Sequence, residues 1–311
     1  MRGSIPGDRK SRITRAILRW YRKNGRALPW RNKRDPYRVI VSEVMLQQTQ
    51  VSRVNVKYPI FLRRFPTLKS LAHAKTSNVI RAWRGMGYNS RALRLQQLAR
   101  AVLDQHGGRM PREIDRLRAL PGVGPYTSHA VACFAFHEQV PVVDTNVFRV
   151  FSRLFPKLLE KSSTPQERVK GAWEIGARML PRGLAFEWNQ ALMDLGASIC
   201  TAASPRCERC PVNRHCGSAF AVKRRARSKA KSEPARDGVP NRVYRGRVVE
   251  ALRNLDANRS IPFPTLGRML KPNFSRRDKA WLTKLLTDLE RDGLIATRSS
   301  RTAIQISMPE S

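Results

Sequence analysis

Four cysteines lie within one short polar segment of the sequence, at Cys200, Cys207, Cys210 and Cys216, spaced C-x6-C-x2-C-x5-C. Four thiolates in one loop can enclose a single metal centre, either a [4Fe–4S] cluster or a structural zinc ion. Zinc sites usually combine two C-x2–4-C pairs, and this segment has one, so the spacing favours the cluster. Disulfides are disfavoured because nothing else in the sequence indicates an oxidising compartment. The fifth cysteine, Cys133, lies in the apolar run AVACFAF and is predicted to be a buried thiol.

Two carboxylates occur where acid–base chemistry is possible. Glu43 follows Ser42 near a predicted helix start, in an otherwise apolar and amide-rich segment. A half-buried glutamate there could hold a proton at neutral pH. Asp144 stands between the apolar run VPVV and the helical stretch NVFRVFSRLF. From the residues alone, helix capping is the simpler interpretation for both carboxylates.

A tight turn is predicted at residues 120–124, Leu-Pro-Gly-Val-Gly, between two helical stretches. The proline ends the first helix, and the glycines permit backbone with positive φ. The second helix then begins with bare N–H groups, which bind a phosphate oxygen without base specificity. A lone PGVG is weak support for such a site, because any corner between two helices could show it.

Taken together, the hairpin, the segment VPVVDTNVFRV and the four-cysteine loop resemble the helix–hairpin–helix DNA glycosylase superfamily that includes endonuclease III. The segments LPWRNKRDPYRVIVSEVMLQQTQV, WRGMGYNSRA and FEWNQALMDLGASICT narrow the resemblance to adenine-specific mismatch glycosylases of the MutY type. The resemblance covers roughly residues 12–220. It implies a base-excision repair enzyme that hydrolyses the N-glycosidic bond of adenine mispaired with 8-oxoguanine or guanine in duplex DNA.

Breaking an N-glycosidic bond builds positive charge on the sugar and negative charge on the base, so one acid and one carboxylate are needed. The resemblance implies that Glu43 protonates adenine N7 and then serves in water activation. It assigns Asp144 to the anomeric carbon and Asn146 to orienting that site. Tyr126 stands where bifunctional relatives carry a lysine whose amine attacks the sugar. A phenol cannot form a Schiff base, so the resemblance implies a monofunctional enzyme, with Tyr126 hydrogen-bonded near Asp144.

The target base must leave the helical stack to reach these groups. The resemblance implies that Gln48 and Tyr88 wedge into the duplex. It also implies that the adenine pocket is lined by Trp30, Arg31 and Gln190. Exposed loop side chains remain the alternative for the two wedge residues, and ordinary core packing remains the alternative for Trp30. The hairpin is expected to contact DNA through Gly122, Val123 and Gly124.

The composition favours a polyanionic partner. The chain of 311 residues has 60 Lys and Arg against 23 Asp and Glu, a formal charge of +37, and such an excess favours nucleic acid. No apolar stretch approaches a membrane span, and the first residues lack the apolar centre of a signal peptide. We expect a monomeric, cytoplasmic and nucleoid-associated protein with no membrane partner.

Helical periodicity dominates to about residue 220, which predicts an all-α body, and the resemblance implies that this body has two lobes. The resemblance divides this body, residues 12–220, into a six-helix lobe at about 30–137 and a cluster lobe at about 12–29 plus 138–220. Residues 221–241 are predicted to be a basic disordered linker. Residues 242–309 read as three helices and two strands, the order of a winged helix.

Long relatives carry a C-terminal domain that inspects the opposing 8-oxoguanine, and this tail resembles that of short-form relatives instead. How the opposing base is recognised is therefore open. Two other functions compete with adenine excision. A thymine or uracil mismatch glycosylase would share the hairpin and the cysteine loop, but Glu43 and the LQQTQ segment oppose it. A non-catalytic iron–sulfur DNA-binding regulator is opposed by the presence of both Glu43 and Asp144.

Overall fold

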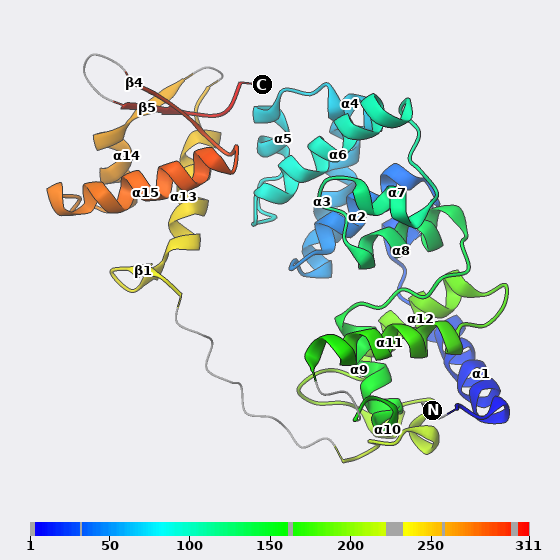
Figure 1. Cartoon of the computed structure of the whole chain (residues 1–311). Helices are drawn as coiled ribbons and strands as arrows, with labels where there is room; N and C mark the ends of the chain where they lie inside the picture. Colours follow the sequence, from blue (N-terminus) through cyan, green and yellow to red (C-terminus); the bar gives the residue numbers. More distant parts are fainter. Residues whose placement is uncertain are drawn as a thin grey trace. The chain divides into compact units, whose positions relative to one another are not determined.

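The computed structural model describes residues 4–31, 33–160, 164–221, 233–256, 259–299 and 304–310. Contacts divide the chain into two compact units. The first unit lies within residues 1–40, 112–119 and 123–229, and the second within residues 41–111, 120–122 and 230–311. Each unit therefore combines segments that are distant in the sequence (Figure 1).

All regular structure described between residues 4 and 221 is helical, which confirms the all-α prediction for the body. The α-helices of this part are α1 (Gly7–Asn24), α2 (Pro36–Leu46), α3 (Val51–Arg64), α4 (Leu68–Ala72), α5 (Thr76–Ala82), α6 (Ser90–His106), α7 (Ile114–Ala119), α8 (Pro125–Phe136), α9 (Thr145–Leu154), α10 (Pro156–Leu159), α11 (Pro165–Met179) and α12 (Ala185–Ser198). Short 3-10 helices are η1 (Pro29–Arg31), η2 (Cys207–Arg209) and η3 (Asn213–His215). No helix among the described residues is long and apolar enough to cross a membrane.

The first unit is built around α1, α9, α11 and α12, whose apolar faces share one core that includes Phe151 and Trp188. Helices α9 and α12 approach closely at Gly196. A Cβ atom at that position would lie 2.7 Å from the Cβ of Asn146, far inside van der Waals contact, so only glycine fits without movement. Cys133 on α8 is fully buried, as predicted, and burial raises the pKa of its thiol to about 11.

The C-terminal module of the second unit contains α13 (Asn241–Arg253), β3 (Ser260–Pro262), α14 (Phe263–Leu270), η4 (Arg276–Asp278), α15 (Lys279–Arg291), β4 (Ala296–Ser299) and β5 (Ile304–Ser307). Its strands form an antiparallel sheet in the order β3-β5-β4. The predicted order of three helices followed by two strands is present, and the arrangement is typical of a winged helix. Strand β3 was not predicted, because three residues are too few to show an alternating pattern.

The prediction of a disordered linker is wrong for its final part. Residues 235–240 form a hairpin of β1 (Ala235–Arg236) and β2 (Val239–Pro240). Its turn is Asp237-Gly238, with φ of +50° and +74°, an Asp-Gly pair suited to two successive positive φ values. Arg236 pairs with Asp278 of η4 at 2.5 Å, which joins the hairpin to the module. The most basic part of the predicted linker, residues 222–232, lies outside the described residues.

Candidate active site and cysteine loop

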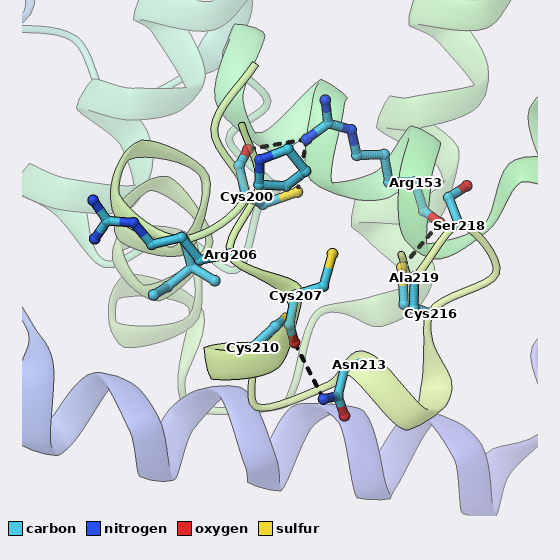
Figure 2. A pocket seen from close by; sticks show the side chains of 11 residues that line it. Arg153, Cys200, Arg206, Cys207, Cys210, Asn213, Cys216, Ser218 and Ala219 are labelled. Carbon is cyan, nitrogen blue, oxygen red and sulfur yellow. Dashed lines mark hydrogen bonds between the residues drawn. The ribbon is translucent and has the colours of Figure 1, made fainter. Parts of the chain in front are cut away.

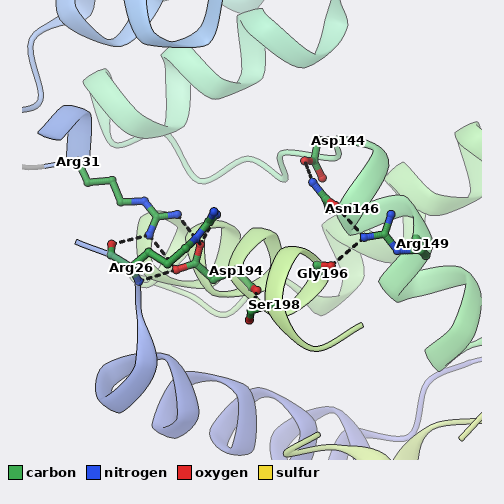
Figure 3. Close-up of polar contacts among 8 residues, drawn as sticks. All are labelled: Arg26, Arg31, Asp144, Asn146, Arg149, Asp194, Gly196 and Ser198. Atoms are coloured by element: carbon green, nitrogen blue, oxygen red, sulfur yellow. Dashed lines mark hydrogen bonds and ion pairs between the residues drawn. The ribbon is translucent and has the colours of Figure 1, made fainter. Parts of the chain in front are cut away.

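Asp144 is fixed from two sides at the start of α9. Its Oδ1 accepts a hydrogen bond from the backbone N–H of Val147 at 2.7 Å, so the capping interpretation is correct. Its Oδ2 accepts from Nδ2 of Asn146 at 2.8 Å, and the carboxylate stays half-exposed (Figure 3). Capping and a chemical role are therefore compatible, because the cap itself orients the carboxylate.

Asn146 is oriented in turn by Arg149, one helical turn further along α9. Arg149 donates to Oδ1 of Asn146 at 2.7 Å, to the carbonyl of Gly196 at 2.8 Å and to the carbonyl of Cys200 at 2.8 Å. Burial lowers the pKa of the Arg149 guanidinium, while nearby negative groups partly offset this. Hydrogen bonds therefore connect Asp144 to the first cysteine of the loop. The sequence carried one signal for this link, the three-residue spacing of Asn146 and Arg149 on a single helix.

Glu43 lies inside α2, which begins at Pro36, so the alternative interpretation of Glu43 as a helix cap is wrong, and its catalytic assignment stays a prediction. Its side chain is 6 % exposed and follows the fully buried Ser42. This burial agrees with the expectation of a carboxyl group in an apolar segment. Glu43 belongs to the second unit and Asp144 to the first.

The two predicted wedge residues share an unusual backbone. Gln48 has φ of +54° and Tyr88 has φ of +44°, a region that non-glycine residues seldom adopt and that costs on the order of 1–3 kcal/mol. Gln48 is exposed, and Tyr88 is 56 % exposed despite its large apolar ring. Packing does not account for either conformation, so each is a candidate for function rather than for core stability.

Arg91 holds the two wedge loops together and was missed by sequence reasoning. It is 5 % exposed, and its two terminal nitrogens donate to acceptors on both loops. The acceptors are the carbonyls of Val44, Met45 and Gln47, the hydroxyl of Thr49, and the carbonyls of Met86 and Gly87. The guanidinium also lies 5.8 Å from the ring centre of Tyr88. Burial lowers the pKa of Arg91 to about 10, so the group is still a cation at neutral pH.

The hairpin between α7 and α8 has the predicted turn. Gly122 has φ of +76°, as the turn requires, and Val123 is buried. Gly124 differs from the prediction, because its φ of −95° and ψ of −178° are open to any residue. It is the N-cap of α8, where no side chain caps the first turn. A helix start of this kind can bind an anion through backbone N–H groups.

Tyr126 lies in the first turn of α8 and is half-buried. Its predicted hydrogen bond near Asp144 stays a prediction. The turn and Tyr126 are both features to which the sequence analysis assigned a role.

The side chains predicted to line an adenine pocket are buried, and one of them, Arg31, forms an ion pair with Asp194. Trp30 and Gln190 are 8 % and 5 % exposed. The guanidinium of Arg31 forms two hydrogen bonds with the carboxylate of Asp194, at 2.7 and 2.9 Å, and Arg26 binds the same carboxylate (Figure 3). Burial raises the pKa of Asp194, but the hydrogen bonds and charges of Arg31 and Arg26 outweigh it and hold that pKa below its usual range. Asp194 was missed because its partners are more than 160 positions away.

The four loop cysteines line one pocket, together with Arg153 and Asn213 (Figure 2). All four are half-buried free thiols. A guanidinium nitrogen of Arg153 lies 3.4 Å from Sγ of Cys200, and the thiol of Cys216 donates to the carbonyl of Arg153 at 3.2 Å. Among the described residues, no group of three or more His, Cys, Asp or Glu side chains is close enough to hold a single ion. The donor set nonetheless fits a thiolate-bound cluster, with Arg153 placed to offset negative charge on the sulfur atoms.

Comparison with known proteins adds to this geometry. Residues 41–177 match the model of the HhH-GPD superfamily base excision DNA repair protein. The chain is 39 % identical over 291 residues to the adenine DNA glycosylase of Mycobacterium tuberculosis (strain ATCC 25618 / H37Rv), which covers 90 % of this chain and 86 % of that protein. The chain belongs to the adenine DNA glycosylases. It is thus an adenine-specific DNA N-glycosylase of base-excision repair, and DNA is its partner.

Other relatives of this adenine DNA glycosylase cover less of the chain. The Homo sapiens adenine DNA glycosylase is 41 % identical over 210 residues, which is 65 % of this chain and 38 % of the human protein. Among solved structures, a thermostable thymine-DNA glycosylase aligns with a TM-score of 0.65 and 31 % identity over 69 % of this chain and 98 % of that one. A trapped endonuclease III–DNA complex aligns at 0.60 and 22 % identity, over 70 % of this chain and 98 % of that one, which supports the fold alone.

Proposed function

We propose that this enzyme hydrolyses the N-glycosidic bond of adenine opposite 8-oxoguanine or guanine and leaves the DNA strand uncut. The observation that carries the proposal is the oriented carboxylate of Asp144, held by Asn146 and the start of α9, in a chain that also buries Glu43. These are the two groups that N-glycoside hydrolysis requires.

In the proposed reaction, Glu43 donates its proton to N7 of adenine as the bond between C1′ and N9 breaks. The bonding electrons leave with the base, and the sugar becomes a cation that the carboxylate of Asp144 faces. A water molecule then adds its oxygen to C1′ and returns a proton to Glu43. Asn146 keeps Asp144 from rotating away, because its amide binds one oxygen while the backbone of Val147 binds the other.

Paired substitutions test these roles. Glu43→Gln and Asp144→Asn should each lower the single-turnover rate of adenine release by about 10²- to 10⁴-fold while duplex affinity stays near that of the wild type. Asp104→Asn, on the exposed face of α6, makes the same chemical change outside the site and should keep the wild-type rate. Wild-type rates in Asp144→Asn would remove its assignment.

The mispair is tested with duplexes that contain A:8-oxoG, A:G, T:G or uracil, followed by alkali to cleave abasic sites. We expect product from the first two and none from the others. Release of thymine would instead support a mismatch specificity like that named for the thymine-DNA glycosylase neighbour.

The uncut strand follows from Tyr126, because a phenol supplies no amine to attack C1′. Tyr126→Lys places an amine in the first turn of α8. We expect this variant to yield an adduct with DNA that borohydride traps, whereas Tyr126→Phe should yield none. If Tyr126→Lys releases adenine but never forms the adduct, residue 126 does not face the sugar.

We also propose that Cys200, Cys207, Cys210 and Cys216 hold a [4Fe–4S] cluster and that the enzyme acts as a monomer. The spacing and the shared pocket support the cluster. When bound, a cluster of this type holds the loop in shape, and the proposed reaction takes no electron from it. Iron and sulfide analysis of anaerobically purified protein should find about four of each per chain. Zinc instead of iron in active protein would refute the assignment, and sedimentation tests the monomer.

A further inference from the structure

The C-terminal module is attached to the helices that carry the Tyr88 loop, within the same compact unit. Ile80 of α5 and Leu93 of α6 belong to the apolar core of the module. Arg253, at the end of α13, is buried and donates twice to the carbonyl of Ile80, at 2.8 and 3.0 Å. It also donates to the side chain of Asn89 at 2.9 Å, and Asn89 directly follows Tyr88.

Charged groups reinforce this attachment. Arg84 pairs with Glu250 of α13 at 2.6 Å, and Arg81 donates to the carbonyl of Leu255 at 2.8 Å. The module is therefore held against α5 and α6 by a buried arginine and a shared apolar core, and not by the chain connection alone. The position of α13 relative to Tyr88 follows from these contacts.

A pocket of about 270 Å³ lies where the Tyr88 loop meets the first turns of α13. Tyr88 forms part of its wall, and α13 contributes Arg242 and Arg245. Leu294 adds an apolar patch. The pocket thus combines an exposed aromatic ring with two guanidinium groups, at a loop whose backbone is strained.

Both arginines keep donors for a further acceptor. Nε of Arg242 binds Glu233 at 2.6 Å, and a terminal nitrogen of Arg245 binds Asp292. A guanidinium has five N–H groups in a planar fork, so a single carboxylate partner does not saturate it. The same fork matches the oxygens of a phosphate.

We propose that this pocket binds a backbone phosphate of the DNA strand that passes the Tyr88 loop, with Arg242 and Arg245 as its ligands. The inference rests on the proposed function, in which Tyr88 enters the duplex. Each DNA strand carries one phosphate per about 3.4 Å of helix axis, so a strand that meets Tyr88 presents a phosphate to the pocket that Tyr88 lines. The C-terminal module is then a direct part of the DNA interface.

The test compares two variants of α13 that remove equal charge. Arg242→Gln changes a pocket residue whose side chain is 61 % exposed, and Arg247→Gln changes an exposed residue of the same helix outside the pocket. Duplex affinity is measured against salt concentration. We expect Arg242→Gln to weaken binding about tenfold and to make the slope of log K against log salt shallower by about 0.9, the value of one lost phosphate contact. Arg247→Gln should leave both near wild type.

A second measurement locates the phosphate. Duplexes with one neutral methylphosphonate at a time should include one position that weakens wild-type binding and has no further effect on Arg242→Gln. The doubly substituted Arg242→Gln/Arg245→Gln protein should likewise show no further effect of that methylphosphonate, provided that it keeps the wild-type unfolding midpoint. If it does not keep that midpoint, the single variant alone decides the test. Equal slopes for Arg242→Gln and Arg247→Gln, or additive effects at every phosphate, would overturn the inference.

These outcomes are separate from failure of the proposed function. Loss of the proposed function would appear as absent adenine release by wild-type protein. The phosphate contact is measured by binding alone, with the salt slope taken on duplexes without a mispair and the methylphosphonate series on duplexes whose mispaired adenine fixes the register, in a Glu43→Gln background.

Discussion

Replacing Arg91 by lysine is expected to uncouple the two wedge loops while keeping the charge. The arginine serves six acceptors through two nitrogens, and it is buried where water cannot replace it. A lysine ammonium has three N–H donors at a single nitrogen. Three of the six acceptors would therefore lose this donor, although the carbonyls of Met86 and Gly87 also accept from Oγ1 of Thr49 and Nε1 of Trp83.

The magnitude follows from this count. Each buried acceptor left without a donor costs about 1–3 kcal/mol, and relaxation of the loops brings the sum to its lower end, about 3 kcal/mol. A loss of about 3 kcal/mol shifts the ordering of the loops by roughly hundredfold, because 1.4 kcal/mol is a factor of about ten.

The assay separates loop order from chemistry. Single-turnover release of adenine is measured on an A:G duplex and on a duplex with adenine opposite an abasic-site analogue, where the base is already poorly stacked. Arg91→Lys should slow release from the first by roughly hundredfold and from the second by less, because less unstacking is needed there. Arg63→Lys, on the exposed end of α3, is the matched control.

The outcome that would refute this reasoning is clear. If Arg91→Lys has the wild-type rate on A:G and an unchanged free energy of unfolding in urea, the guanidinium network does not hold the loops. An equal slowing on both duplexes would place the effect on chemistry and not on entry of the wedge.

Two further changes test the first unit. Asp194→Asn should lower the free energy of unfolding by about 3–5 kcal/mol, because it leaves Arg31 buried without its counter-charge. The control, Glu187→Gln, breaks an ion pair with an exposed arginine and should cost about 1 kcal/mol or less. The pKa of Asp194 is lowered in the folded state, so its contribution to stability is fully present above pH 3.8 and disappears as the pH falls through the folded pKa. In acid unfolding curves, the stability difference between wild type and Asp194→Asn should therefore shrink below pH 3.8. Gly196→Ala should lower the free energy of unfolding by about 1–3 kcal/mol and also slow adenine release, since the new methyl group pushes on Asn146. Normal activity at reduced stability would mean that Asn146 does not orient Asp144.

The parts of the fold that the sequence predicted are those with local causes. Gly122 adopts positive φ because a tight turn after a proline demands it, and Asp144 caps α9 because a helix starts at the next residue. The helical body and the order of elements in the C-terminal module follow from apolar periodicity. The capping interpretation of Glu43 failed at a helix boundary, since α2 begins seven residues earlier, at Pro36.

What the sequence did not predict is a set of buried and half-buried arginines that bind backbone carbonyls. Arg91, Arg149 and Arg253 each lie in a chain with 60 Lys and Arg, where any one of them is expected on the surface. Their partners are backbone carbonyls up to 173 positions away, and a carbonyl leaves no trace in the sequence. The fold alone determines which arginines meet such carbonyls.

These buried arginines give the basic composition a second use. An exposed arginine supplies charge and a planar fork of donors to a phosphate. Arg91 binds carbonyls at the end of α2 and in the two wedge loops, and Arg149 and Arg253 bind carbonyls in the last turns of α12 and α5. Since a buried carbonyl without a donor is costly, removing one of these guanidinium groups should loosen the backbone that it binds. The loops of the proposed wedge, the oriented carboxylate and the pocket beside Tyr88 are therefore held in place by arginines through the geometry of their donors as well as through their charge.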